Sequence, residues 1–167
     1  MCRPIPPVPR KDSDDMHPFM QQISITYRCA MRFREKELAD TGLAGCQTPY
    51  LTALCRRPGI TQEELAQELS VNKSSVTRQL CSLEENGYVR REASPCDRRS
   101  LLVYPTEKTY AVMGRIFSCY GEWNEYLTQD FTDGEKAELS RLMLRIADRA
   151  AAYVKGGSSA CEPLDTI

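Results

Sequence analysis

Residues 61–104 constrain the fold of this chain more than any other stretch of the sequence. Thr61 and Glu64 have the spacing of a capping box, in which each side chain bonds the backbone amide of the other residue. Apolar residues then recur at helical spacing, at Leu65, Ala66 and Leu69. The stretch therefore opens with a short predicted helix that begins next to Thr61 and buries one face.

A second helix is predicted directly after a turn at residues 70–72. Asn72 is a good N-cap for this helix, and Val71 is expected to be buried as the plug of the turn. Apolar residues follow at steps of four and three, at Val76, Leu80 and Leu83. Asn86 and Gly87 should end the helix, because glycine tolerates the left-handed conformation of a helix stop.

The opposite side of this second helix carries short hydroxyl groups and two long cations. These residues are Lys73, Ser74, Ser75, Thr77 and Arg78. Such side chains suit base edges and phosphates in a DNA groove. A solvated helix face that binds nothing is the alternative interpretation. Together with Asn72, we take these residues as candidate DNA-binding residues.

A two-stranded ribbon is predicted after the second helix, with strands at residues 88–92 and 100–104 and a stop at Pro105. Asp97, Arg98 and Arg99 lie near its tip. A carboxylate two residues from an arginine can hold the guanidinium in one direction, and the minor groove attracts such a cation. An exposed salt bridge of little energy is the other interpretation. Two helices and a ribbon in this order predict a winged helix-turn-helix.

The same residues resemble the multiple-antibiotic-resistance-regulator (MarR) family. The resemblance rests on four motifs: Thr61-Gln-Glu-Glu-Leu-Ala, Leu69-Ser-Val-Asn-Lys-Ser-Ser-Val-Thr-Arg, Leu83-Glu-Glu-Asn-Gly-Tyr-Val-Arg-Arg and Asp97-Arg-Arg. It implies a dimeric transcription factor, usually a repressor, whose affinity for DNA changes with small ligands or oxidants. By this resemblance, residues 73–78 begin the recognition helix, and Asp97 and Arg99 match the Asp-x-Arg pattern of the wing. Thr109 departs from the family, which commonly has glycine there.

The resemblance also implies an effector site between the dimerisation helices and the DNA-binding unit. Tyr27, Arg34, Tyr50 and Trp123 are the candidates for contacts with such a ligand. Ordinary packing is the alternative role for each of them. The sequence does not identify the effector.

The rest of the chain is predicted to be helical, which gives a mainly α fold with a small β-wing. Helices are expected at residues 17–40, after Thr48 and Pro49, after Thr106, and after the capping box of Thr132 and Glu135. The expected organisation is a flexible arm at 1–15, a dimerisation helix and linker at 16–47, the winged helix-turn-helix at 48–105, dimerisation helices at 106–155 and a flexible tail at 156–167. The terminal helices are too apolar for a lone winged helix, so a second copy should cover them. A two-fold dimer predicts a near-palindromic operator.

The distribution of charge along the chain is consistent with a local DNA-binding surface. The whole chain has a formal net charge of −1, which excludes a uniformly basic DNA-coating protein. Between Asn72 and Tyr104, however, the sequence has six cationic side chains and only four acidic ones. Affinity for DNA should fall as salt rises, because phosphate contacts release counterions.

The eight cysteines do not form a metal-binding pattern. None are spaced as Cys-x-x-Cys and His17 is the single histidine, so we expect neither a metal nor a cofactor. Four cysteines fall in predicted helices and are expected in the core: Cys29, Cys55, Cys81 and Cys119. Cys96, beside the wing arginines, and Cys46 are candidate redox residues, because neighbouring cations make a thiol more reactive.

Several functions are excluded by what the sequence lacks. It has no secretory signal and no apolar run near the roughly 20 residues of a membrane span, so a cytoplasmic protein is expected. It has no phosphate-binding glycine loop and no Ser-His or Cys-His arrangement, so an enzyme is not expected. The remaining alternative is a winged helix that binds a protein partner rather than DNA. Replacing Arg78 or Arg99 with alanine would distinguish the two.

Overall fold

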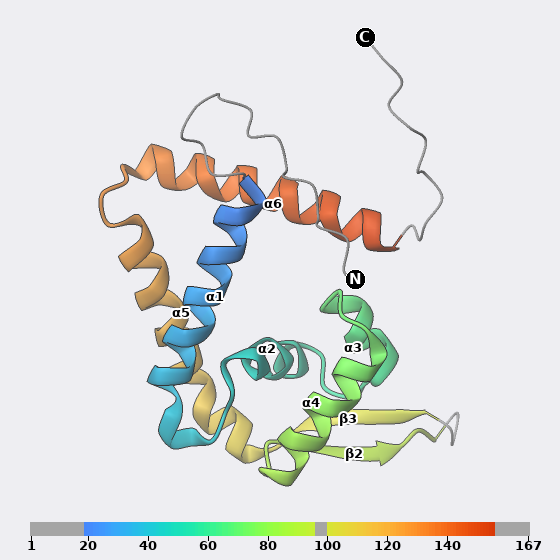
Figure 1. Ribbon diagram of the computed structural model, residues 1–167. Coiled ribbons are helices and arrows are strands. Elements are labelled where there is room, and N and C mark those ends of the chain that lie inside the picture. The colour runs from blue at the N-terminus through green and yellow to red at the C-terminus, as the bar shows by residue number, and fades with distance from the viewer. Residues whose placement is uncertain (1–18, 96–99, 156–167) are drawn as a thin grey trace, which may run out of the picture.

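The computed structural model describes residues 19–95 and 100–155. This part of the chain forms six α-helices and a small sheet, which lies at one end of the molecule (Figure 1). The helices are α1 (Phe19–Glu37), α2 (Thr48–Arg56), α3 (Gln62–Glu68), α4 (Lys73–Glu85), α5 (Glu107–Thr128) and α6 (Asp133–Lys155). Two short 3-10 helices, η1 (Ala39–Thr41) and η2 (Gly45–Gln47), join α1 to α2. The predicted mainly α fold with a small β-wing is confirmed.

The sheet has three antiparallel strands, β1 (Ile60–Thr61), β2 (Val89–Ala93) and β3 (Leu101–Pro105), in the order β1-β3-β2. The sequence predicted the hairpin of β2 and β3, in which Arg91 pairs with Val103. It did not predict β1, whose Ile60 also pairs with Val103. Two residues are too few to show the alternation of a strand, and β1 exists only because β3 offers a free edge.

One core fills the space between the helices and the inner side of the sheet. The predicted inward residues of α4, Val76, Leu80 and Leu83, are all fully buried. The expectation for Val71 was wrong, because its side chain is 37% exposed. Ser70 has a left-handed φ of 53°, and the Val71 amide donates to the Ala66 carbonyl oxygen at 3.0 Å. The turn is therefore closed by its backbone, without a buried side chain.

Two threonines at helix starts differ from their expected roles. Thr48 is the first residue of α2 rather than its cap, and Gln47 precedes it. Thr106 precedes α5 as predicted, but its hydroxyl caps no α5 amide and instead donates to the carbonyl oxygens of Gly87 at 2.7 Å and Tyr88 at 3.1 Å. The buried Thr109 hydroxyl also donates to the Tyr88 oxygen. Threonine at position 109 thus ties α5 to the start of the wing.

The helices divide the molecule into a frame, which α1, α5 and α6 form, and the predicted DNA-binding unit, which α3, α4 and the hairpin of β2 and β3 form. Helices α1 and α5 stand together on one side, and α3, α4 and the hairpin lie on the other, with α2 between them (Figure 1). Helix α6 lies on the side of the frame away from the sheet (Figure 1). The expected helix at 17–40 ends earlier, at Glu37, where η1 follows. The predicted flexible segments 1–15 and 156–167 lie outside the described residues.

Candidate nucleic-acid interface

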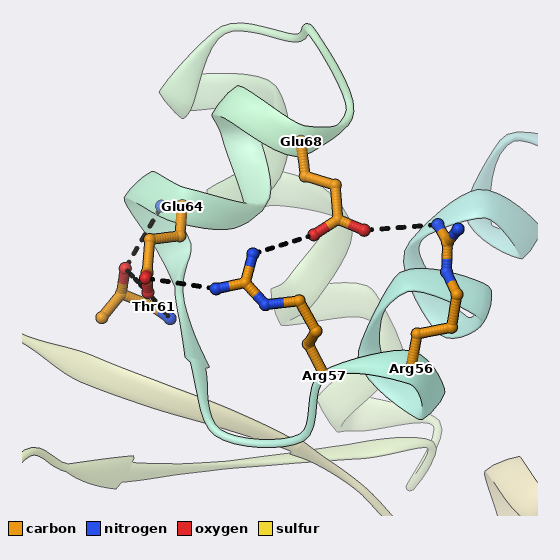
Figure 2. Close-up of polar contacts among 5 residues, drawn as sticks. All are labelled: Arg56, Arg57, Thr61, Glu64 and Glu68. Atoms are coloured by element: carbon orange, nitrogen blue, oxygen red, sulfur yellow. Dashed lines mark hydrogen bonds and ion pairs between the residues drawn. The ribbon is translucent and has the colours of Figure 1, made fainter.

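The start of α3 is fixed by the predicted capping box. The Thr61 hydroxyl accepts from the Glu64 amide at 3.2 Å, and the Glu64 carboxylate accepts from the Thr61 amide at 2.9 Å and hydroxyl at 2.7 Å (Figure 2). These hydrogen bonds from Thr61, with the nearby Arg57 charge, hold the pKa of Glu64 below its usual range. The capping box is confirmed, and it begins the first helix of the helix-turn-helix.

Arginines at the end of α2 fasten the outer side of α3. Arg56 pairs with Glu68 at 3.2 Å, and Arg57 pairs with both Glu64 and Glu68 at 3.5 Å (Figure 2). These exposed pairs contribute little free energy individually. Their geometric effect is to hold two carboxylates of α3 against α2, so that α3 keeps its orientation beside α4.

Replacing Thr61 with alanine is expected to lower the free energy of unfolding by about 1 kcal/mol, as for other N-cap replacements. Because the folded pKa of Glu64 is depressed, its contribution is fully present above the unfolded pKa and is lost as the pH falls through the folded pKa. The variant should therefore lose part of the wild type's acid dependence. Urea unfolding at pH 7 and below pH 4 measures both effects. Thr61→Ser keeps the hydroxyl and serves as the control, and equal stability of all three proteins would refute the cap.

The recognition helix α4 also begins as predicted. The Asn72 side-chain oxygen accepts from the Ser75 amide at 2.8 Å and from the Ser74 hydroxyl at 2.9 Å. Asn72 is therefore occupied by capping, and the same contact turns Ser74 toward the helix start. Both residues hold the first turn of α4 in place.

The candidate DNA-facing side of α4 is exposed. Lys73, Ser74, Thr77 and Arg78 are exposed, whereas Ser75 is half-buried. Lys73 Nζ lies 3.9 Å from a carboxylate oxygen of Glu63, and the Thr77 hydroxyl donates to the Lys73 carbonyl oxygen at 3.0 Å. None of the ion pairs within residues 19–95 and 100–155 involves Arg78. An exposed guanidinium with this freedom can turn toward an anion or a base edge.

The wing carries a further cation that the sequence analysis did not select. Arg90 is exposed, lies 4.6 Å above the Tyr104 ring and forms an ion pair with Glu92. Its neighbour Arg91 donates to Glu84 of α4 and so fastens β2 to the recognition helix. Successive residues of a strand point to opposite faces of the sheet. The sequence therefore indicates that one of the adjacent residues Arg90 and Arg91 points outward, and this signal could have identified a second cation on the wing.

The predicted wing tip, Asp97, Arg98 and Arg99 together with Cys96, lies outside the described residues. Where the wing meets α4, the ion pair with Arg91 of β2 lowers the pKa of Glu84 on α4, mainly through the hydrogen bond between the two side chains. This pair fixes the base of the wing relative to α4. The two elements that would approach DNA are thus joined directly to each other.

The four effector candidates differ in exposure and in their contacts in the single chain. Arg34 is buried and donates to the Thr48 and Tyr120 hydroxyl oxygens, both at 3.2 Å. Tyr50 is also buried, which raises its pKa. Tyr27 is exposed on α1, and Trp123 stacks with Phe33 and Tyr126 at centroid distances of 5.1 and 5.9 Å.

The cysteines have mixed surroundings. Cys119 is buried as expected, but Cys29 is exposed, and Cys55 and Cys81 are only half-buried. The core assignment of Cys29 was wrong because α1 packs through its other side in the single chain. Cys46 is half-buried in η2. Burial raises the pKa of the Cys55 and Cys119 thiols, which lowers their fraction of reactive thiolate.

The part of the chain that the structure describes contains no cluster of three or more residues suited to hold a metal ion. In the same residues, none of the helices has the length and apolar character needed to cross a membrane.

Comparisons with known proteins agree with one another. The model of the MarR family matches residues 41–100. The uncharacterized HTH-type transcriptional regulator YwoH of Bacillus subtilis (strain 168) is 31% identical, and the match covers 74% of this chain and 89% of YwoH. A crystal structure of MarR has 30% identity and a TM-score of 0.77, covering 86% of this chain and 97% of that one. A MarR-family transcriptional regulator from Listeria monocytogenes, complexed with 26mer DNA, has 25% identity and a TM-score of 0.77 over 87% of this chain and 99% of its own.

Proposed function

Because this chain belongs to the MarR family of transcription regulators, we propose that it binds a near-palindromic operator in double-stranded DNA as a homodimer and represses transcription in the cytoplasm. The recognition helix α4 enters the major groove at its N-terminal turns, through Asn72, Lys73, Ser74, Ser75, Thr77 and Arg78. The wing enters the minor groove through Arg98 and Arg99, with Asp97 orienting Arg99. A small ligand or an oxidant changes the affinity of the dimer for DNA.

The observation that carries the proposal is the exposed polar side of α4. Its outward residues are hydroxyls and cations, while Val76, Leu80 and Leu83 fix the opposite side in the core. Arg78 is not engaged by a carboxylate among the described residues. The helix can therefore present its hydrogen-bonding groups to a DNA groove without first breaking an ion pair of Arg78. The DNA complex of the similar Listeria protein supports the same use of this fold.

The homodimer is supported by apolar side chains that the single chain leaves exposed. They lie on the three frame helices: Phe19, Met20, Ile25 and Tyr27 on α1; Tyr110, Phe117, Tyr126 and Leu127 on α5; and Leu139, Leu142, Met143, Leu144, Tyr153 and Val154 on α6. Exposed apolar surface of this extent is typical of an interface. A second copy with the same helices would cover it, as two-fold symmetry requires.

The effector part of the proposal is supported by the position of Arg34 and Tyr50. Both are buried where α2 meets the frame, so a ligand that displaced either would shift the DNA-binding unit relative to α1 and α5. Cys46 lies in the same joint, and Cys96 belongs to the wing. These two thiols are the candidates for an oxidant response.

Titrating a duplex with the protein across a salt series tests the proposal. Wild type should bind a duplex selected from a random pool, and log K should fall linearly with log salt, with a slope of about −0.9 for each phosphate neutralised. Lys73→Ala should weaken binding to all sequences alike and reduce the slope by about 1. If wild type captures no duplex at low salt, or if its affinity does not depend on salt, a protein-binding winged helix becomes the better assignment.

A further inference from the structure

The first residue of α2, Thr48, is tied to two of the three frame helices, α1 and α5. The Thr48 hydroxyl oxygen accepts from Arg34 of α1 at 3.2 Å and lies 2.8 Å from the Tyr120 hydroxyl of α5. Arg34 also donates to Tyr120 at 3.2 Å. Three side chains from α1, α2 and α5 therefore share one set of hydrogen bonds.

Gln47, the residue immediately before Thr48, is tied to the recognition helix α4. Gln47 Nε2 donates to the Ser82 hydroxyl oxygen of α4 at 3.1 Å, while its Oε1 accepts from the Ala44 amide at 3.0 Å. The side-chain amide of Gln47 is thus held at both of its ends. A single peptide bond, between Gln47 and Thr48, joins the contacts with the frame to the contact with α4.

The middle of this network is buried, whereas its two ends, Tyr120 and Ser82, are half-buried. The exposed fractions are 0% for Thr48, 3% for Gln47 and 8% for Arg34. A buried donor or acceptor that loses its partner costs far more than the same loss at the surface. Any tilt of α4 relative to α1 and α5 that separates these groups is therefore penalised, so the contacts favour one orientation.

We propose that the buried residues Gln47 and Thr48 are positioning residues. They form a polar relay from Tyr120 and Arg34 in the frame to Ser82 in the recognition helix, and this relay sets the half-site spacing that the dimer accepts. The inference rests on the proposed function. In a two-fold dimer, the frame fixes the separation of the two recognition helices, and half-site spacing follows from that separation. A stiff link between frame and α4 makes an off-spacing operator costly, whereas a loose link lets each helix adjust.

The test uses two variants at opposite ends of the relay, Ser82→Ala and Tyr120→Phe, and their combination. Each removes one hydroxyl and little volume. Thr52→Val is the matched control, because the Thr52 hydroxyl on α2 donates only to the Thr48 carbonyl oxygen, within its own helix, at 3.0 Å. Affinity is measured for a duplex selected by the wild type and for derivatives with one base pair added to or removed from the centre. Thermal unfolding of all proteins is measured in parallel.

Each relay variant should reduce the discrimination between correct and altered spacing by about fivefold, which corresponds to one hydrogen bond. The double variant should be no worse than either single variant, because one break already releases α4. Thr52→Val should discriminate like the wild type.

Unchanged discrimination in both single variants, with the wild type binding normally, would overturn the relay alone. The relay would be overturned equally if the two losses simply add, or if the melting temperature falls while the spacing preference does not. Failure of the wild type to bind any duplex would overturn the proposed function as well.

Discussion

Replacing Arg78 with alanine is expected to weaken binding to the specific operator by about 1–3 kcal/mol, or roughly 5- to 150-fold, if the side chain reads a base. Arg78 is exposed on the outer side of α4, and none of the ion pairs within the described residues has to break when it turns toward DNA. A bidentate contact with guanine is its most specific use. Fluorescence anisotropy with the selected duplex and with an unrelated duplex of equal length measures the loss and its sequence dependence.

The folded structure should be indifferent to the same change. Alanine favours a helix slightly more than arginine does, so the unfolding curve of Arg78→Ala should match that of the wild type. Arg145→Ala removes an exposed arginine from α6, far from α4 in the chain, and should leave DNA affinity unchanged. An equal loss on both duplexes would show that Arg78 contacts phosphate rather than bases, and no loss on either would remove α4 from the interface.

The elements that the sequence predicted correctly depend on neighbours a few residues apart. The caps at Thr61 and Asn72 each involve a residue three positions away, and such contacts are visible in the order of the residues. The buried residues of α4 follow from the helical period in the same way. Because the apolar residues of α4 define its buried side, they also define its exposed polar side. The candidate DNA-facing residues could therefore be chosen from the sequence.

The features that the sequence did not predict depend on distant partners. Strand β1 exists because β3, some 40 residues later, pairs with it. Thr109 is fully buried because its hydroxyl meets the carbonyl oxygen of Tyr88, 21 residues away. Val71 resembles a buried plug by its chemistry, but the backbone of the turn leaves it exposed. No periodicity encodes such contacts.

The polar joint between frame and recognition helix illustrates the same limit. Gln47 and Ser82 are 35 positions apart, and Arg34 and Tyr120 are 86 apart. Polar residues in helices ordinarily face water, so nothing in the sequence distinguishes Gln47 or Thr48 from surface residues. Arg34 was selected only through family resemblance. The structure adds that it is buried among hydroxyls, where a charge is costly unless hydrogen bonds satisfy it.

Replacing Leu80 with alanine is expected to have the largest effect on stability, lowering the free energy of unfolding by about 2–5 kcal/mol. Leu80 is fully buried in the core beneath α4. The loss combines the transfer free energy of the removed carbons with the cost of the cavity that remains. Urea unfolding followed by circular dichroism measures the change, and the unfolding slope should stay constant while the midpoint falls.

Gln79→Ala trims the neighbouring residue of the same helix, which is only half-buried, and it should change the unfolding free energy by less than about 1 kcal/mol. The pair separates the burial of Leu80 from any general effect of shortening a side chain on α4. A similar small change in both variants would mean that α4 is not anchored through this side. Its outer side would then not be fixed toward solvent, and Arg78 and its neighbours would lose the rigid support on which base reading depends. Stability at position 80 and DNA affinity at position 78 therefore test the two sides of one helix.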